Sequence, residues 1–181
     1  MRLLERWRAW RALRSYAPLS ASSREGKRVR ATGVVRVLDE TVVAPLTGRE
    51  CVAARSRIRG APYPSVMLQI RPFVLELSTP PTVVVDGGDA LFGVSAVDRR
   101  PINLEREMSF AARFGVKLSA NVWFEEEVVI APGDRVTIGG VLMHDLNPQP
   151  PSNERAFREG VPPRLRLVGS EQHPLVIVAA R

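Results

Sequence analysis

The chain has 181 residues, a net charge of +7 and one cysteine. This length suits a single domain that buries its own core. One cysteine excludes an internal disulfide, a four-cysteine zinc site and the zinc-binding RING of ubiquitin ligases. Cys51 lies in an apolar stretch, which predicts a buried structural thiol rather than a nucleophile.

The excess positive charge is confined to the N-terminal segment. Residues 1–30 contain nine basic and two acidic residues, whereas the other 151 residues contain seventeen of each sign. A neutral body, in a chain with only 6% aromatic residues, does not have the composition of a nucleic-acid-binding groove. We therefore expect no sequence-specific nucleic-acid binding, although the N-terminal segment could bind RNA without sequence preference. Any anionic partner should meet the first thirty residues.

Residues 1–17 are predicted to form a basic amphipathic helix. Strong helix formers fill this segment, and no glycine or proline occurs before Pro18. Apolar residues recur at three- and four-residue spacing and are opposed by arginines. Such a helix is typical of the membrane interface, where indoles lie at the headgroup level and guanidinium groups meet anionic lipid. The predicted membrane or partner contacts are Leu3, Arg6, Trp7, Trp10, Arg11, Leu13 and Arg14.

Two other interpretations of this helix stay open. It could pack on its own domain or on a partner and use arginine as a solvated rim. It could also be a removed targeting segment, because serines follow it, although Glu5 fits that interpretation poorly. We find no secretory signal and no run of the ~20 apolar residues that a spanning helix needs. We therefore expect a cytoplasmic protein, not secreted, that is soluble or peripheral on the inner face of a membrane.

Residues 18–28 are predicted to be a polar, flexible linker, and residues 29–181 a β-rich domain. Alternation over residues 32–38 and the turn residues Pro45 to Gly48 predict a hairpin in which residues 51–58 pair beside the first strand. Further turns are expected at residues 86–89 and 131–134. Further extended segments are expected at residues 66–77, with Pro72 at an edge or bulge, and at 82–85, 90–94, 122–130, 135–143, 165–168 and 174–179.

A second helix is predicted over residues 102–115. Gly115 would end it, and its apolar side would contain Leu104, Met108, Ala111 or Ala112, and Phe114. Residues 146–164 are predicted to form an exposed, proline-rich loop. The expected fold class is mainly β, a small barrel or partly open sandwich with one packed helix and an N-terminal amphipathic helix.

Few residues suggest chemistry. Glu125 and Glu127 would share one face of a strand and Glu126 the other, but with no histidine nearby a solvated strand face is the better interpretation. A metal site would need scattered ligands without metal-site spacing. The Gly87–Gly88 pair lacks the lysine and helix of a phosphate-binding loop, so a plain turn is favoured. We predict no catalytic residue, metal or cofactor; the scattered metal candidates are His144, Asp145, His173 and Cys51.

Several short motifs follow one another in a recognisable order. Their positions are Gly33, Pro45, Gly48, Cys51, Arg55, Pro72, Phe73, Val83, Val85, Asp86, Glu127, Pro132, Gly133, Val136 and Gly139. The order of these motifs resembles the GIDE-type domain, also called the "beside a membrane" domain, over roughly residues 28–180. This family occurs in a mitochondrial ubiquitin ligase, its chloroplast relatives and many prokaryotic membrane proteins.

The resemblance implies a β-rich domain that works at a membrane or on a partner protein. Family members typically carry transmembrane helices, and the ligases carry a RING; we expect neither here, and no ligase activity. The leading hypothesis is a non-enzymatic, membrane-peripheral module whose N-terminal helix contacts anionic lipid and whose β-rich domain binds a protein partner. The alternative is a soluble protein-binding or assembly module whose helix docks on a partner or a second subunit.

Overall fold

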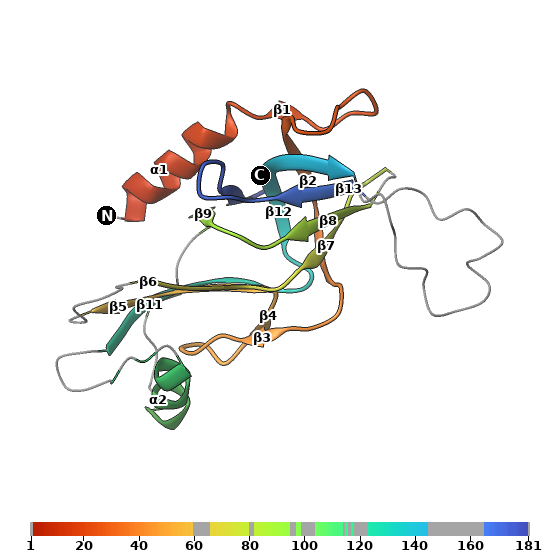
Figure 1. Ribbon diagram of the computed structural model, residues 1–181. Helices are drawn as coiled ribbons and strands as arrows, with labels where there is room; N and C mark the ends of the chain where they lie inside the picture. The colour runs from red at the N-terminus through yellow and green to blue at the C-terminus, as the bar shows by residue number, and fades with distance from the viewer. Residues whose placement is uncertain are drawn as a thin grey trace, which may run out of the picture.

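The computed structural model describes residues 2–59, 66–79, 82–94, 97–98, 104–113, 115, 117, 123–144 and 165–180. Strands dominate this part of the chain (Figure 1), so the expected mainly β fold class is confirmed. The first half forms α1 Arg2–Leu13, β1 Ala17–Pro18, β2 Arg28–Val37, β3 Val42–Val43, β4 Glu50–Cys51, β5 Ala53–Arg59, β6 Val66–Ile70, β7 Phe73–Glu76, β8 Val83–Asp86 and β9 Ala90–Gly93. The second half forms β10 Val97–Asp98, α2 Leu104–Arg113, β11 Trp123–Ile130, β12 Arg135–His144, β13 Leu165–Val168 and β14 Leu175–Ala179.

A closed barrel of five strands forms the centre of the described structure. Around it, β2 pairs with β7, β7 with β8, β8 with β13, β13 with β12, and β12 with β2 again. Of these pairs only β8–β13 is parallel. Numbered along the chain, the barrel strands follow one another in the order 1-2-3-5-4, which is the Greek-key order of an OB-type barrel. The barrel interior is apolar; its fully buried side chains include Phe73, Leu75, Ile138, Leu142 and Leu167.

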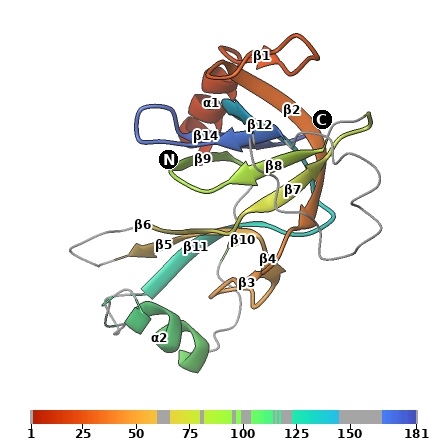
Figure 2. The same ribbon diagram turned by 45° about the vertical axis from the view of Figure 1, so that its right-hand side comes forward.

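The long strand β12 joins the barrel to an outer layer. One of its edges pairs with β2, and its other edge pairs first with β14 and then with β13. Strand β9 extends this layer by pairing in parallel with β14, and β1 pairs in parallel with β2. Helix α1 lies against β14 and β9 (Figure 2). The outer layer therefore provides the surface on which the N-terminal helix rests.

A second sheet has four antiparallel strands in the order β10–β11–β5–β6. Successive residues of β11 point to opposite faces of this sheet. Val128 and Ile130 join the barrel core, whereas Val129 packs with Cys51 and Ala54 beneath the β3–β4 pair. The sheet separates α1, on one side, from β3, β4 and α2 on the other (Figure 1).

The predicted pairing of residues 32–38 with residues 51–58 is wrong, although both segments form strands. Strand β2 pairs with β7 and β12, and β5 pairs with β6 and β11. The turn at Pro45 to Gly48 instead closes the short β3–β4 pair, with Gly48 at a φ of 67°. The turns at residues 86–89 and 131–134 also join strands that pair elsewhere. Turn residues fix a local reversal, whereas the faces that must be buried select the pairing partners.

The second helix forms near its predicted position, but its packed face differs from the prediction. Ala111 is fully buried and Gly115, at a φ of 68°, follows the helix, as expected. Met108, however, is 51% exposed, and Glu107 is buried. The predicted apolar positions Leu104 and Phe114 lie outside the described side chains, and the predicted loop at 146–164 lies outside the described residues.

Proline 72 lies between two strands rather than within one. Strand β6 ends at Ile70 and β7 begins at Phe73, so the missing N–H group of Pro72 interrupts no ladder. The prediction of one extended segment over residues 66–77 with Pro72 at an edge or bulge is therefore wrong, because the chain forms two strands with Pro72 between them. This break lets β6 belong to the four-stranded sheet while β7 belongs to the barrel.

Candidate functional site: the outward face of the N-terminal helix

Helix α1 packs on the body through a narrow inward face. Ala9, Leu13 and the following Tyr16 are buried against Val176 and Val178 of β14. The Tyr16 hydroxyl also donates a hydrogen bond to the backbone carbonyl of Pro174, at 3.3 Å. The interpretation that the helix packs on its own domain therefore holds for this face.

Two glycines allow the helix to approach the strands closely. A Cβ at Gly139 of β12 would lie 2.9 Å from Leu13 Cδ1 and 3.1 Å from Tyr16 Cδ1. A Cβ at Gly93 of β9 would lie 3.1 Å from the Cβ of Ala9. All three distances are shorter than an ordinary van der Waals contact, so the position of α1 depends on these small residues.

An ion-pair cluster fixes the N-terminal half of α1. The Glu5 carboxylate accepts hydrogen bonds from both terminal nitrogens of Arg55, each at 3.1 Å, and from Arg57 Nη2 at 2.8 Å. The Nε of Arg57 lies 3.3 Å from Glu126 Oε1. The hydrogen bond from Arg55 is the main reason that the pKa of Glu5 lies below its ordinary value of 4.5, although burial opposes this shift. Bidentate arginine–carboxylate geometry makes this contact orientation-specific.

The segment after the helix is held to the barrel as well. The backbone N–H of Leu19 donates to the carbonyl of Arg30 at 2.8 Å, and that of Gly26 donates to the carbonyl of Leu142 at 2.8 Å. The predicted linker at residues 18–28 is thus tied down at both ends by backbone hydrogen bonds. Helix, linker and barrel form one packed arrangement in the structure.

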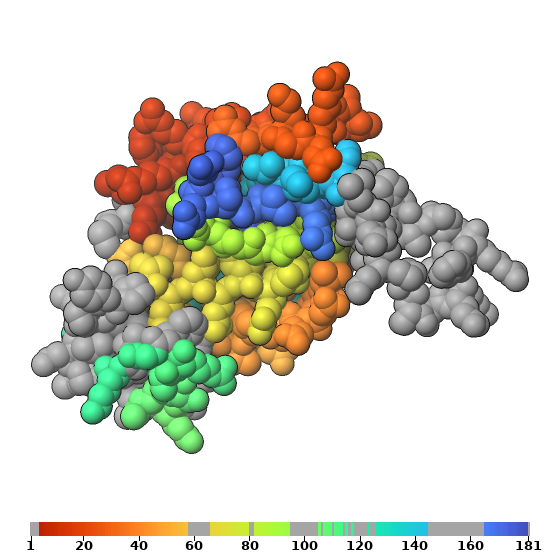
Figure 3. All heavy atoms as spheres, viewed as in Figure 1, coloured from red at the N-terminus to blue at the C-terminus, as the bar shows by residue number. Residues whose placement is uncertain are grey.

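The opposite face of α1 is exposed. Leu4, Trp7, Arg11 and Arg14 follow one another at three- and four-residue spacing and share this face. Leu4 is 55% exposed and Trp7 is 56% exposed, and the Arg11 guanidinium lies 5.0 Å from the centre of the Trp7 ring. Figure 3 shows α1 as a ridge that projects from the upper edge of the molecule. This face combines apolar and cationic groups that no other element of the described chain covers.

A hollow of about 380 Å³ adjoins the outward face, between Trp7, Trp10, Arg14 and Arg30. The Nη1 of Arg30 donates to the backbone carbonyl of Leu13 at 3.4 Å, a long hydrogen bond at the C-terminal end of the helix. A cation at this end is favoured by the helix dipole. The hollow therefore presents indole walls and guanidinium groups together.

The seven predicted contact residues differ in their exposure to solvent. Arg6, Trp7, Arg11 and Arg14 are exposed, Trp10 is partly buried, and Leu13 is 2% exposed against the barrel. The side chain of Leu3 lies outside the described residues. The periodicity of residues 1–17 did not predict Leu4 and Arg30 as contact residues, because it placed Trp7 and Leu13 on one face of the helix. The small residue Ala9, which faces Gly93, sets the rotation of the helix instead.

The acidic cluster of β11 has structural contacts. Glu127 is fully buried, and its carboxylate accepts hydrogen bonds from the backbone of Leu46 and Thr47 and from the hydroxyls of Thr47 and Ser56. Glu126 is 6% exposed and pairs with Arg57. The predicted solvated face is therefore wrong for both residues. The side chain of Glu125, at a register shift between Phe124 and Glu126, lies outside the described residues.

The remaining candidates for chemistry are also placed. Cys51 is fully buried and donates its S–H to the carbonyl of Val42 at 3.3 Å, so the predicted structural thiol is confirmed. Burial, together with the charge of Glu127, raises the pKa of this thiol to about 12. His144 lies at the end of β12 and His173 lies between β13 and β14, while Asp145 lies outside the described residues. Within the described ranges, no group of three or more His, Cys, Asp or Glu side chains could hold a metal ion.

Neither helix that the structure describes is long and apolar enough to cross a bilayer. The chain matches no family model, no curated protein and no solved structure.

Proposed function

We propose that this chain is a non-enzymatic module that binds an anionic membrane surface through the outward face of α1 and offers its β-rich body to a protein partner. The observation that carries the proposal is the exposure of Leu4 and Trp7 beside Arg11 and Arg14 on a helix whose other face is already buried. Burial of Leu13 removes the need for a partner on the inward face. The exposed indole and leucine therefore point to an external apolar or interfacial contact.

The charge distribution supports the same surface. Arg6, Arg8, Arg11 and Arg14 are exposed, and no carboxylate of the described residues forms an ion pair with them. Each cation near an anionic membrane contributes about 1 kcal/mol of binding free energy at physiological salt. Burial of Trp7 and Leu4 in the headgroup region would add an apolar contribution. Because Glu5 and Leu13 fix α1, little ordering of the helix is needed on binding.

The resemblance to GIDE-type domains is part of this proposal. Among the matching positions, Pro45, Gly48, Cys51 and Glu127 lie together in the structure, because Glu127 binds the Pro45-to-Gly48 turn and Cys51 packs beneath it. Motifs that are far apart in the sequence are thus neighbours in space.

Vesicle co-sedimentation of the full chain tests the proposal. We expect binding to vesicles of mixed phosphatidylglycerol and phosphatidylcholine, weaker binding to phosphatidylcholine alone, and loss of binding as salt rises. Arg11→Gln and Arg14→Gln should each weaken binding about fivefold, which corresponds to about 1 kcal/mol. Trp7→Ala should also weaken it. Arg113→Gln, an exposed arginine of α2 far from α1, is the control and should change nothing.

Two results would overturn the membrane assignment. The first is equal binding of the wild-type chain to neutral and anionic vesicles, or no binding to either. The second is a dimer, detected by light scattering, that dissociates in the Trp7→Ala variant while vesicle binding is absent. This second result would favour the alternative, an assembly module whose helix docks on a second subunit.

A further inference from the structure

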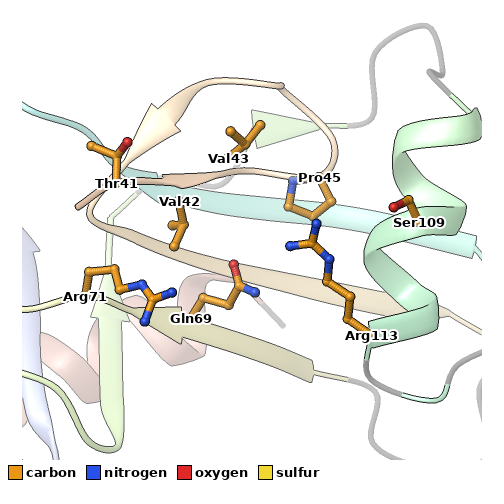
Figure 4. A pocket seen from close by; sticks show the side chains of 8 residues that line it. All are labelled: Thr41, Val42, Val43, Pro45, Gln69, Arg71, Ser109 and Arg113. Atoms are coloured by element: carbon orange, nitrogen blue, oxygen red, sulfur yellow. The ribbon is translucent and has the colours of Figure 1, made fainter.

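A second hollow, of about 340 Å³, lies on the side of the four-stranded sheet away from α1 (Figure 4). Val42 and Val43 of β3 and the buried Pro45 form an apolar wall. Gln69 of β6 lies beneath them, and Ser109 of α2 faces them. Its volume falls in the lower part of the range found for small-molecule sites.

Two arginines enter this hollow from opposite sides. In Figure 4 the guanidinium groups of Arg71, which follows β6, and Arg113, in the last turn of α2, both point toward the space between β3 and Gln69. Arg71 has a long ion pair with Glu40, at 3.6 Å, and both side chains are more than half exposed. No carboxylate of the described residues pairs with Arg113. The hollow therefore holds an excess of positive charge beside an apolar wall.

We propose that this hollow binds a small organic acid, with its carboxylate between Arg71 and Arg113 and its apolar part against Val42, Val43 and Pro45. Guanidinium groups match the carboxylate in shape and charge, and two of them hold it better than one. Val43 is 51% exposed and would be covered by the apolar part of the ligand. The amide of Gln69 can donate to a second oxygen. This inference goes beyond the proposed function and does not depend on α1.

A titration of the full chain by ¹H–¹⁵N NMR at constant ionic strength tests the proposal. The three probes are hexanoate, inorganic phosphate and 1-hexanol, which separate the acid as a whole from its charge alone and its apolar part alone. We expect saturable shifts with hexanoate, centred on the amides of Val43, Gln69 and Ser109, and clearly weaker binding of the other two probes. Phosphate binding as tight as hexanoate binding would show that the apolar wall contributes nothing. Equal hexanol binding would show that the arginines contribute nothing. Either result would overturn the proposal.

Three variants test which residues bind hexanoate. Arg113→Gln should weaken hexanoate binding about tenfold, because a charge-assisted hydrogen bond is lost. Glu40→Gln should strengthen binding, because it removes the carboxylate that competes for Arg71. Arg24→Gln, an exposed arginine outside both hollows, should leave binding unchanged. All three residues are exposed, so thermal unfolding should not change and folding does not confound the comparison. Equal weakening by Arg24→Gln, or weaker binding by Glu40→Gln, would contradict the proposal.

Discussion

The carboxylate of Glu127 holds the backbone of Thr47, a residue 80 positions earlier in the chain. Its Oε2 accepts from the Thr47 N–H at 3.0 Å and from the Thr47 hydroxyl at 2.8 Å. Its Oε1 accepts from the N–H of Leu46 at 3.0 Å and from the hydroxyl of Ser56 at 3.2 Å. One buried side chain therefore supplies the acceptors that a buried turn needs, since an unpaired N–H group would be costly there.

Replacement of Glu127 by alanine should strongly destabilise the fold. We expect Glu127→Ala to lower the free energy of unfolding by about 3 kcal/mol or more, because it leaves one buried and one partly buried backbone N–H group and two hydroxyls without acceptors. Urea denaturation measures the change. Glu50→Ala removes an exposed carboxylate from the same β3–β4 region and should cost less than about 0.5 kcal/mol. Equal effects of the two variants would show that the contacts of Glu127 contribute little.

The contact of Glu5 with Arg55 should make stability depend on pH. The pKa of Glu5 is lowered in the folded protein, so its contribution is present above its ordinary value of 4.5 and is lost as pH falls through the folded-state pKa. Glu5→Gln should therefore cost about 1 kcal/mol near pH 7 and clearly less near pH 3. Urea denaturation at the two pH values measures this difference.

The exposed pair of Arg36 and Glu76 provides the control for Glu5. Its nitrogen and oxygen lie 2.7 Å apart, but both side chains are more than half exposed. We expect Glu76→Gln to change the free energy of unfolding by no more than about 0.5 kcal/mol at either pH. A Glu5→Gln effect that is independent of pH would refute an electrostatic role for Glu5.

A methyl group at Gly93 should displace α1. The added Cβ would lie 2.7 Å from Val178 Cγ1 and 3.1 Å from the Cβ of Ala9. We expect Gly93→Ala to lower the free energy of unfolding by about 1–3 kcal/mol. Trypsin should also cleave at the arginines of α1 faster, because the helix is held less firmly on the body. Gly87→Ala is the matched control, because its Cβ would meet nothing closer than 3.7 Å. Unchanged proteolysis of α1 in the Gly93→Ala variant would count against the close approach.

The thiol of Cys51 should resist alkylation in the native protein. It is fully buried, and its pKa of about 12 leaves almost no thiolate near pH 8. Iodoacetamide should therefore label Cys51 only after denaturation, as mass spectrometry of the intact chain would show. Rapid labelling of the folded chain would mean that the β3–β4 region opens readily.

The sequence predicted elements better than pairings. Alternation and turn residues located most strands within a few positions, and Gly48, Gly115 and Gly133 occupy the left-handed conformations that turns and helix ends require. Pairings depend on which faces become buried once the barrel closes. Closure joins β2 to β12, as in the hydrogen bond between Thr32 and Thr137, 105 residues apart. No local pattern carries that information.

In the candidate sites, too, local features could be predicted from the sequence, whereas features that depend on the tertiary fold could not. The amphipathic helix was predictable from its periodicity, but its rotation was not, because Gly93 and Gly139 lie far along the chain. The buried role of Glu127 was hidden for the same reason, since its partners follow Pro45. The second hollow left no signal at all, because Arg71 and Arg113 come from elements that only the tertiary fold brings together.

The packing of α1 on β14 also has a consequence for the synthesis of the protein. The helix is translated before β14, on which it rests, and the hydrogen bond from the Tyr16 hydroxyl to the Pro174 carbonyl spans 158 residues. Until β14 has been synthesised, Ala9 and Leu13 lack Val176 and Val178, against which they pack in the folded protein. The nascent chain therefore exposes both faces of this helix. The inward face is fully covered only after β14 has been synthesised, and the folded protein then exposes the outward face alone.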